Sequence, residues 1–497
     1  MTLKSILAIP FAKYTYNKEK KWIDHPLKAQ QKTLTYLIEQ GRSTAFGKDH
    51  DFNHINDYAS FKDRVPVRDY EQLKSYVNRI IEGEKDVLWP GQPAYLAKTS
   101  GTTSGAKYIP ITAESMKEQV RSSKNALLFY IAQTKNANYV NGKMIFLQGS
   151  PVLTKKGNIN VGRLSGISAH YLPSYLLKNR LPSWETNCIE EWEDKVDAIV
   201  EETSKENMTL IAGIPSWVQM YFEKLKASSG KKVGELFPNF SLFVYGGVNY
   251  EPYRKKFENL IGRKVDSIEL FPASEGFFAF QDDQNDNGLL LQLNSGIYYE
   301  FIPIEHYFDE NPPRLNIEEV ELGKDYALVL STTAGLWGYD IGDTVRFTSL
   351  KPYKIIVSGR VKHFISAFGE HVIAKEVEQA MKEAIEQTDA RVNEFSVAPQ
   401  INPKEGLPFH EWFVEFDQMP KDISTFAAII DESMQRQNIY YKDLLEGNIL
   451  RPAVISAVSK GGFEAYMSAE GKLGGQNKVK RLSNDRLMAD KLSSFLQ

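Results

Sequence analysis

Short apolar runs alternate with helical stretches through the middle of the chain, and this alternation constrains the fold more than any other feature. The runs predicted as strands are 144–147, 210–212, 242–245 and 265–270. Helices are predicted after Pro215 and over 252–261, each between two of these strands. Because strand, helix and strand in succession form the unit of a parallel sheet, the sequence predicts an α/β core with a mostly parallel sheet.

The segments before this core have recognisable boundaries. Asp69 starts a predicted helix, and Gln72 completes its capping box three residues later. Thr112 caps a long predicted helix that extends to about residue 133. The other elements predicted here are an amphipathic helix over 27–42 and strands over 94–98 and 108–111.

The C-terminal part changes character twice. Residues 288–358 hold β-rich runs separated by Gly, Asn and Pro, which predicts an antiparallel subregion. After Gly359-Arg360 the pattern is that of a compact α+β unit, with strands over 363–367, 391–399, 410–416 and 450–458 and helices over 373–387 and 422–437. We therefore expect a large N-terminal α/β domain over 1–361 and a small C-terminal α+β domain over 362–497.

Composition and charge exclude several classes of function. Sixty Lys and Arg against 63 Asp and Glu give a net charge of −3, so nucleic acid is not expected as a partner. Cys188 is the single cysteine, which excludes an intrachain disulfide and favours a reducing cytoplasm. The apolar run 6–12 is interrupted by Pro10 and precedes no cleavage site, and no run approaches the ~20 apolar residues of a spanning helix. We expect a cytoplasmic monomer with no signal peptide and no membrane partner.

The most informative motif is Thr99-Ser100-Gly101-Thr102-Thr103-Ser104-Gly105-Ala106-Lys107. Closely spaced backbone N–H groups and hydroxyls are the donors that a phosphate needs, and Lys107 adds a positive charge. The run is not a Walker A loop, because Ala106 and Tyr108 break that pattern. From the residues alone, phosphate binding and a structural β-hairpin turn both stay open.

Two further motifs follow predicted strands of the core. Phe271-Pro272-Ala273-Ser274-Glu275-Gly276 lies at the carboxyl end of a strand, where α/β sheets bind ligands. Its Glu and Ser offer hard oxygen ligands for Mg²⁺ near phosphates, although a solvated loop is the alternative. Tyr245-Gly246-Gly247-Val248 would let a planar ligand approach the backbone.

The last motif is Gly338-Tyr339-Asp340-Ile341-Gly342-Asp343, followed 16 residues later by Gly359-Arg360-Val361-Lys362. The Asp343 carboxylate can accept both hydroxyls of a ribose, although a Gly-Asp hairpin turn is the alternative. The eight His residues lack metal-ligand spacing, and there is no G-x-S-x-G nucleophile motif.

In this order and spacing, the motifs resemble those of adenylate-forming enzymes. Residues 99–107 resemble the phosphate loop, 271–275 the aromatic-x-x-(Ser/Thr)-Glu motif, and Gly342-Asp343 with Gly359-Arg360-x-Lys362 the ribose-binding and hinge motifs. The closest resemblance is to the Gretchen Hagen family of auxin-responsive acyl-acid amido synthetases, in what looks like its bacterial form. Further similar stretches at 44–50, 213–217 and 475–478 extend the resemblance over nearly the whole chain.

The resemblance implies a large N-terminal domain and a small C-terminal domain that moves about a hinge. It also implies a two-step reaction that uses ATP and Mg²⁺. A carboxylic acid and ATP give an acyl-adenylate and pyrophosphate, and the amine of an amino acid then gives an amide and AMP. The chemistry is coherent, because AMP turns a carboxylate oxygen into a leaving group while Mg²⁺ and fixed donors offset the phosphate charge.

The resemblance also implies site residues, position by position. The ATP-binding set comprises Thr99, Ser100, Gly101, Thr102, Lys107, Gly246, Gly247, Phe271, Ser274, Asp343 and Arg360. Glu275 is the catalytic acid on the Mg²⁺ and phosphate side, and Lys362 is the hinge residue. Lys478 is the catalytic lysine that closure of the small domain brings into the site.

The sequence departs from the family pattern at two site positions. Asp340 stands where plant members have Arg, and Phe271 replaces a Tyr. An acyl-CoA ligase-like enzyme that transfers to a thiol and a catalytically inactive nucleotide-binding protein stay as alternatives. Acid specificity is expected in 124–133 and 160–175, where Arg163 and His170 are either polar contacts to the acid or solvated surface residues.

Overall fold

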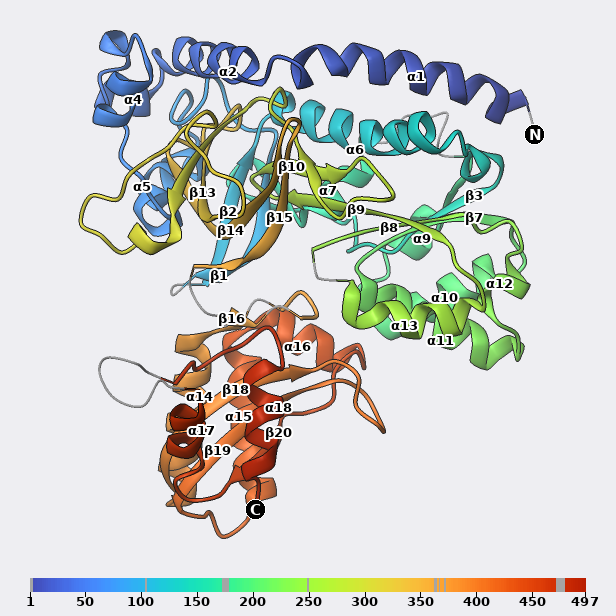
Figure 1. The fold of residues 1–497 in the computed structure, drawn as a ribbon, viewed down its shortest axis with the longest axis vertical. Coiled ribbons are helices and arrows are strands. Elements are labelled where there is room, and N and C mark those ends of the chain that lie inside the picture. Colours follow the sequence, from blue (N-terminus) through green and yellow to red (C-terminus); the bar gives the residue numbers. More distant parts are fainter. Residues whose placement is uncertain are drawn as a thin grey trace.

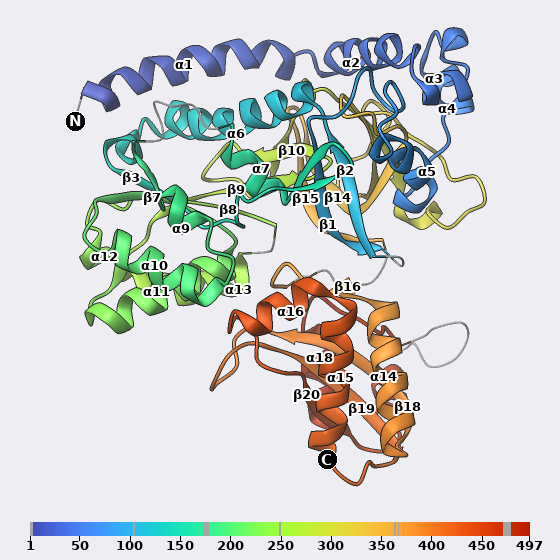
Figure 2. The same cartoon turned by 180° about the vertical axis from the view of Figure 1, so that it is seen from behind.

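The computed structural model describes residues 3–102, 105–171, 178–247, 250–361, 364–365, 367–370, 372–470 and 479–497. Figures 1 and 2 show a large domain that contains the N-terminus and a smaller domain that contains the C-terminus. Strand β15 (Tyr353–Arg360) is the last of the large domain, and β16 (Phe364–Ile365) is the first of the smaller one. The expected mixed α/β architecture with two unequal domains is confirmed.

A mixed sheet of eleven strands, in the order β12-β13-β14-β15-β11-β10-β9-β8-β7-β3-β6, forms the centre of the large domain. Its parallel end comprises β3 (Lys143–Phe146), β6 (Arg180–Leu181), β7 (Met208–Ala212), β8 (Leu242–Gly246) and β9 (Asp266–Ala273). Its antiparallel end comprises β10 (Gly276–Gln281), β11 (Leu289–Leu291), β12 (Ile297–Pro303), β13 (Asp325–Thr332), β14 (Tyr339–Leu350) and β15. The predicted parallel core and the antiparallel subregion over 288–358 are both present.

Helices pack around the two sheets of the large domain. They are α1 (Leu3–Ile23), α2 (Pro26–Gly41), α3 (Ala45–Asp49), α4 (Tyr58–Arg64), α5 (Tyr70–Ile81), α6 (Ala113–Thr134), α7 (Leu164–Ala169), α9 (Trp184–Asn187), α10 (Trp192–Thr203), α11 (Pro215–Ser229), α12 (Val233–Leu236) and α13 (Glu251–Ile261). In β8, Phe243 and Tyr245 pack with α11 and α13, whereas Leu242 and Val244 pack with α1 and α6. Burial on both faces explains why these strands are continuous apolar runs rather than alternating ones.

A second sheet of the large domain has the order β2-β1-β5-β4. Its strands are β1 (Tyr95–Thr102), β2 (Gly105–Ile111), β4 (Thr154–Lys156) and β5 (Ile159–Gly162). Strands β1 and β2 are antiparallel neighbours, so the Ser/Thr/Gly run of the sequence lies at the end of a β-hairpin.

The small domain is a three-stranded sheet between two layers of helices. Its strands are β18 (Arg391–Gln400), β19 (Phe409–Gln418) and β20 (Val454–Val458), and the short β17 (Val372–Ile373) pairs with β16. Its helices are α14 (Ala374–Thr388), α15 (Ile423–Gln437), α16 (Ile439–Glu446), α17 (Gly462–Ala469) and α18 (Leu487–Leu492). In β19, Trp412 and Val414 pack with α14 and α15 while Phe413 packs with α17 and α18, as alternation along a strand requires.

The predicted capping residues start the predicted helices. Asp69 and Gln72 form a complete capping box before α5, and Thr112 forms one with Ser115 before α6. The strand expected over 450–458 begins only at Val454, and the apolar run 6–12 lies inside α1, which the sequence did not predict. In the described part of the chain, no helix has both the length and the apolar run needed to span a bilayer.

Candidate active site

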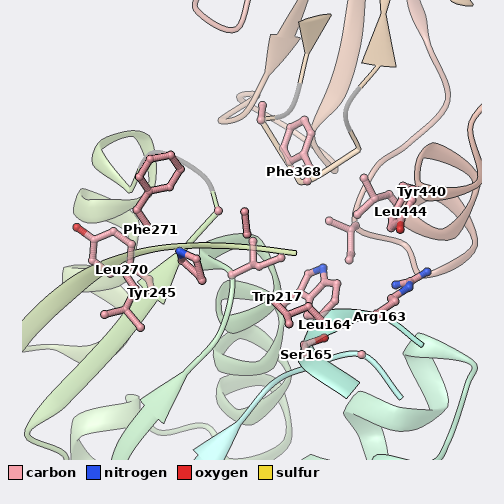
Figure 3. Close-up of a pocket in the computed structure, with 18 of the residues that line it drawn as sticks. Arg163, Leu164, Ser165, Trp217, Tyr245, Leu270, Phe271, Phe368, Tyr440 and Leu444 are labelled. Atoms are coloured by element: carbon pink, nitrogen blue, oxygen red, sulfur yellow. The ribbon is translucent and has the colours of Figure 1, made fainter. Parts of the chain in front are cut away.

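A cleft of about 2120 Å³ lies between the large and small domains. Its walls are the carboxyl ends of β8 and β9, the β1–β2 and β14–β15 hairpins and, from the small domain, the loop after β16 and helix α16. Figure 3 shows Phe271 and Trp217 on the large-domain side, with Phe368 and Tyr440 on the small-domain side. The position at the carboxyl ends of parallel strands is the usual ligand site of α/β proteins.

The β1–β2 hairpin brings Thr99 and Lys107 to this cleft. The two residues pair directly across the strands, and a bulge follows Thr99 before Thr102 pairs with Gly105. The Lys107 Nζ atom lies 5.9 Å from the centroid of the Tyr70 ring. A hairpin turn and a phosphate loop are therefore compatible interpretations of the segment, because Thr99 and Lys107, towards the turn of the hairpin, line the cleft. Residues 103–104 and the side chains of 100–102 lie outside what the structure describes.

Strands β8 and β9 bring Gly247 and Phe271 to the same edge. A Cβ atom on Gly246 would stand 2.5 Å from the carbonyl oxygen of Leu270, so only glycine allows the strands to lie this close. Gly247 follows with a φ of +84°, a backbone conformation that favours glycine. The Phe271 ring packs edge-on against Phe278, with centroids 5.0 Å apart. Open backbone and an aromatic ring at one edge suit a planar ligand.

Ser274 and Glu275 form the two-residue turn between β9 and β10, and both line the cleft. The hydroxyl of Tyr339 is buried and has no hydrogen-bond partner among the residues that the structure describes. Burial, and then the negative charges of Glu275 and Asp340, raise the pKa of this hydroxyl well above its ordinary value. Tyr339 thus interacts electrostatically with Glu275 of the turn. It was not among the predicted site residues, although it belongs to the motif over 338–343.

Glu275 is not part of a preformed metal cage. Within the described ranges, no three His, Cys, Asp or Glu side chains are grouped as metal ligands would be. One carboxylate and one hydroxyl nevertheless suit Mg²⁺, which keeps several waters and takes other oxygens from phosphates. The residues present therefore fit a magnesium ion that arrives with a nucleotide.

Asp343 is buried on β14 and lines the cleft together with Gly359 of β15. It pairs across the hairpin with Arg360, of which only the backbone is described. Gly342, just before it, has a φ of +79°, so the backbone turns there in a conformation that favours glycine.

Asp340 shapes the backbone beside Asp343. Its carboxylate accepts a hydrogen bond from the backbone N–H of Gly342 at 2.7 Å and another from the hydroxyl of Tyr307. The acidic residue is therefore a local support of the β14 turn in this chain.

The loop after β16 carries Phe368 into the cleft. The Glu370 carboxylate accepts a hydrogen bond from the backbone N–H of Phe368 at 2.8 Å and lies 2.8 Å from the Nε2 atom of His410. Both Glu370 and His410 are completely buried. The Tyr253 hydroxyl of the large domain donates to the carbonyl of Ala367 at 2.9 Å, which ties the loop to both domains.

One wall of the cleft comes from α10 and α11, where no site residue was predicted, although Trp217 ends the similar stretch 213–217. Trp192 and Trp217 pack with ring centroids 4.2 Å apart. Both indole N–H groups are buried and have no hydrogen-bond partner in the described part of the chain. Lys195 is buried in the same wall, where its ammonium donates to the carbonyl of Asn187 at 2.6 Å. Burial lowers the pKa of Lys195 to about 8. Only the tertiary structure identifies these residues as part of the cleft wall.

Arg163 links the two domains. Its guanidinium pairs with the Asp443 carboxylate of α16 and lies 4.8 Å from the centroid of the Tyr440 ring. The Nε2 atom of His170 lies 2.9 Å from the carbonyl oxygen of Pro151. Arg163 is therefore an interdomain contact at the cleft, and His170 contacts the backbone of its own domain.

Helix α6 does not contribute to the cleft, contrary to the expectation that 124–133 help to select the acid. None of these residues lines it. Ala126 and Phe129 instead pack against Phe277, Phe280 and Leu290 of the sheet.

The predicted residues thus differ in how far the structure locates them. Those that line the cleft are Thr99, Lys107, Gly247, Phe271, Ser274, Glu275 and Asp343. Gly246 lies directly beneath, whereas Ser100, Gly101, Thr102 and Arg360 are located by backbone alone. Lys362 and Lys478 lie outside the described residues. The structure brings the first group together from strands far apart in sequence, and the individual roles stay predictions.

The sequence matches three domains of one family. They are the GH3 family N-terminal domain over residues 16–183, its central domain over 290–360 and its C-terminal domain over 375–487, which together cover well over half of the chain.

Relatives and solved structures match nearly the whole chain. A jasmonoyl–L-amino acid synthetase from Oryza sativa subsp. japonica is 22% identical over 95% of this chain and 94% of its own length. An indole-3-acetic acid-amido synthetase from Arabidopsis thaliana is 24% identical over 94% and 91%. Among solved structures, the acyl acid amido synthetase AtGH3.15 in complex with 2,4-DB has a TM-score of 0.62 at 17% identity, covering 98% of this chain and 96% of that one. A 2-hydroxyisobutyryl-CoA ligase in complex with 2-HIB-AMP and CoA has a TM-score of 0.58 at 13% identity, covering 96% and 92%.

These matches confirm the fold of an adenylate-forming enzyme. The chain therefore belongs to the GH3 family, the Gretchen Hagen family that its motifs resemble.

Proposed function

We propose that the chain is an ATP-dependent acyl-acid amido synthetase. It adenylates a carboxylic acid with release of pyrophosphate, and then transfers the acyl group to the amine of an amino acid, which gives an amide and AMP. The observation that carries the proposal is that Thr99, Glu275 and Asp343, from three distant motifs, line one cleft between two domains. The names of the relatives, a jasmonoyl–L-amino acid synthetase and an indole-3-acetic acid-amido synthetase, support the same reaction.

Each part of the cleft has a proposed role in holding ATP. The hairpin of Thr99, Ser100, Gly101, Thr102 and Lys107 binds the phosphates. Gly246, Gly247 and Phe271 contact the adenine, and Asp343 accepts the ribose hydroxyls, with Arg360 beside it. The exposed backbone at Gly247 and the buried carboxylate of Asp343 support these assignments.

Glu275 and Ser274 would hold Mg²⁺ at the phosphates. When bound there, the ion supplies positive charge that offsets the charge developing on the phosphate oxygens. Glu275 orients this end of the nucleotide, and its place in a tight turn between two strands supports a fixed position.

Two residues outside the described ranges complete the proposal. Lys362 is the hinge between a domain over 1–361 and a domain over 362–497, and Lys478 is delivered to the cleft when the small domain closes. Side chains of both domains line the cleft, which supports this proposal. Rotation of the small domain relative to the large one would change which residues face the cleft.

Arg163 is expected to stabilise the observed orientation of the small domain. Replacing Arg163 with alanine removes one ion pair, which contributes about 0.2–1 kcal/mol when exposed, and one cation–π contact of about 0.5–1 kcal/mol. The ratio of the rates of the two half-reactions is expected to shift about 3- to 30-fold, measured as pyrophosphate exchange and amide release.

Lys442→Ala is the matched control for this prediction, because Lys442 stands next to Asp443 but pairs with Glu446 within its own helix. An unchanged ratio of rates in Arg163→Ala would show that the contact does not bias the domain orientation.

Transfer to a thiol is the second candidate function. The fold shared with 2-hydroxyisobutyryl-CoA ligase supports it, although that likeness concerns the fold alone. A nucleotide-binding protein without catalysis is the third candidate.

We also propose that the chain is a bacterial form of the family and a cytoplasmic monomer that binds small acids and amino acids but no nucleic acid. Its low identity to the plant relatives supports a separate branch. Asp340, where the resemblance implies Arg in plant members, agrees with this proposal.

A screen of products tests the function. The protein is incubated with ATP, Mg²⁺ and a panel of carboxylic acids, with either amino acids or coenzyme A as the acceptor. We expect AMP and an amide, identified by mass spectrometry, only when an acid and an amino acid are both present. A thioester with coenzyme A would favour the second candidate, and absence of AMP with both acceptors would favour the third.

A further inference from the structure

The outward face of helix α1 exposes an apolar patch. The α1 patch comprises Leu3, Ile6, Leu7, Phe11 and Tyr14, whose exposed fractions are 73%, 52%, 61%, 52% and 68%. Apolar side chains exposed singly are normal on a protein surface, but a contiguous group marks an interaction site. The elements that contact α1 most are α6, α2 and the turn at Asn138–Asn141, and the exposure of the five side chains shows that nothing in the described chain covers this face.

Helix geometry places the patch opposite the buried side of α1. Ser5, Ala12 and Glu19 are the buried residues, and their spacing of seven puts them on one line facing the domain. Leu7 and Tyr14 lie on the opposite line. The patch is therefore a true outer face and not the edge of an interface with the large domain.

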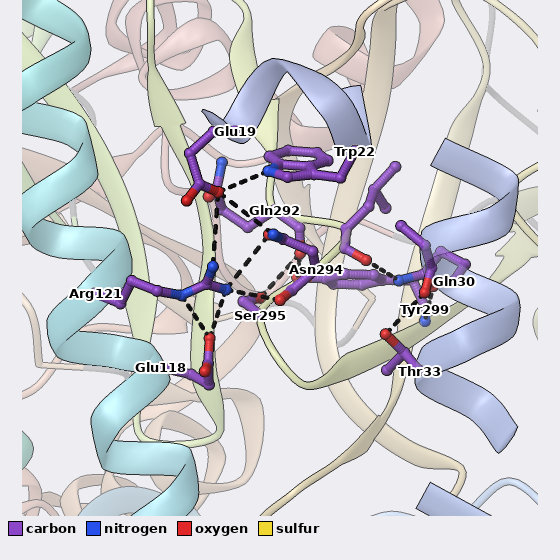
Figure 4. Close-up of polar contacts among 12 residues, drawn as sticks. Glu19, Trp22, Gln30, Thr33, Glu118, Arg121, Gln292, Asn294, Ser295 and Tyr299 are labelled. Atoms are coloured by element: carbon purple, nitrogen blue, oxygen red, sulfur yellow. Dashed lines mark hydrogen bonds and ion pairs between the residues drawn. The ribbon is translucent and has the colours of Figure 1, made fainter. Parts of the chain in front are cut away.

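Polar contacts fix this orientation, as Figure 4 shows around Glu19. The Glu19 carboxylate accepts hydrogen bonds from the Trp22 indole N–H at 2.7 Å and from the Asn294 amide at 3.3 Å. It also lies 3.6 Å from the guanidinium of Arg121, which belongs to α6. In the next helix, Gln30 bonds to the backbone of Tyr299 at 2.9 Å. A rigid attachment of this kind presents the patch without any refolding of the helix.

Basic residues surround the patch. Lys4 and Lys18 lie on the flank with Phe11, and Lys13 lies on the flank with Ile6; all three lysines are exposed. No acidic residue occurs between Leu3 and Lys18, and the first one, Glu19, is buried. The face thus combines a central apolar surface with positive charge on both sides.

We propose that this face of α1 docks the protein on an anionic lipid bilayer. Apolar side chains at the centre would enter the boundary between headgroups and acyl chains, while the flanking lysines meet lipid phosphates. A second copy of the chain is a poorer occupant, because a symmetric contact would bring the same lysines together. The proposal departs from the expectation of no membrane partner, and it concerns surface attachment only.

Co-sedimentation with vesicles tests the proposal on the full chain. The probes are vesicles of phosphatidylcholine with phosphatidylglycerol and vesicles of phosphatidylcholine alone. We expect at least about tenfold stronger binding to the anionic vesicles, reduced by salt. The double variant Leu7→Glu/Tyr14→Glu should lose this binding, because it places charge at the centre of the patch.

The matched control is Phe308→Glu/Leu322→Glu, which changes two apolar residues between β12 and β13. Their exposed fractions, 83% and 61%, are at least as large as that of Leu7. It should bind vesicles like the unmodified protein. A second variant, Lys4→Glu/Lys13→Glu, reverses the flanking charge without touching the apolar centre and should also lose binding. Thermal unfolding is measured for every variant to confirm that it is folded.

Three results would overturn the proposal. They are failure of the unmodified protein to bind anionic vesicles, unchanged binding by both α1 variants, and a concentration-dependent dimer that Leu7→Glu/Tyr14→Glu abolishes while vesicle binding persists. The last result would assign the face to a second copy. Amide synthesis in solution needs no bilayer, so these outcomes are independent of the proposed function.

Discussion

Replacing Asp343 with alanine is expected to weaken ATP binding by more than about 100-fold, with the fold retained. The carboxylate is buried at the cleft, and two hydrogen bonds from ribose hydroxyls to a charged acceptor would contribute about 3–5 kcal/mol together. Calorimetric titration with ATP measures the affinity, and thermal unfolding checks the fold. Asp343→Asn keeps the shape but removes the charge, so an intermediate affinity is expected.

Asp340→Asn is the matched control for Asp343. Asp340 lies on the same strand, but its carboxylate bonds to the backbone of Gly342 and to Tyr307. Asparagine keeps an acceptor for the Gly342 N–H group, so ATP affinity is expected to change by less than about threefold. If Asp343→Ala binds ATP as tightly as the unmodified protein does, Asp343 does not hold the ribose.

Local signals made much of the fold predictable. The capping box of Asp69 and the one of Thr112 involve residues three apart, so the sequence contains the whole interaction. The buried parallel strands are apolar runs bounded by turn residues, and they were found for the same reason. The antiparallel subregion was predictable from its β-rich runs, which Gly, Asn and Pro separate.

Helix α1 was not predictable by the same means. Its buried line consists of Ser5, Ala12 and Glu19, which are small or polar, while its exposed face holds the large apolar residues. The usual relation between hydrophobicity and burial is reversed there, and Pro10 also argues against a helix. Packing on α6 and the bonds of Glu19 stabilise the helix, and both depend on residues far away in sequence.

The candidate site was predictable only as far as its motifs extend. Thr99, Glu275 and Asp343 belong to motifs that suit phosphate, Mg²⁺ and ribose but left a structural alternative open, and the resemblance then implied their roles. Trp217 belongs to the similar stretch 213–217, but neither Trp217 nor Lys195 was predicted to line the cleft, which both reach through the packing of α10 and α11. Arg163 had a visible charge, but its partner Asp443 lies 280 positions away in the other domain, which no local pattern encodes.

Replacing Lys478 with alanine is expected to lower acid-dependent pyrophosphate exchange by at least about 100-fold, the scale of one positioned charged group. Adenylation brings the carboxylate of the acid against the negatively charged α-phosphate, and an ammonium between them would offset their repulsion. This interaction forms mainly in the transition state, so kcat should fall more than KM for ATP rises.

Amide formation from pre-made acyl-adenylate should survive in Lys478→Ala, because the two anions are already joined in that substrate. Lys480→Ala is the matched control, because Lys480 lies two residues after Lys478 and its side chain is exposed. Its backbone carbonyl accepts a hydrogen bond from the Ser396 hydroxyl at 2.7 Å. Both half-reactions should keep their rates in that control. A group that acts only in adenylation affects pyrophosphate exchange but not amide formation from pre-made acyl-adenylate. An equal loss of rate in both half-reactions of Lys478→Ala, or a loss in neither, would therefore show that this lysine does not act in the adenylation step.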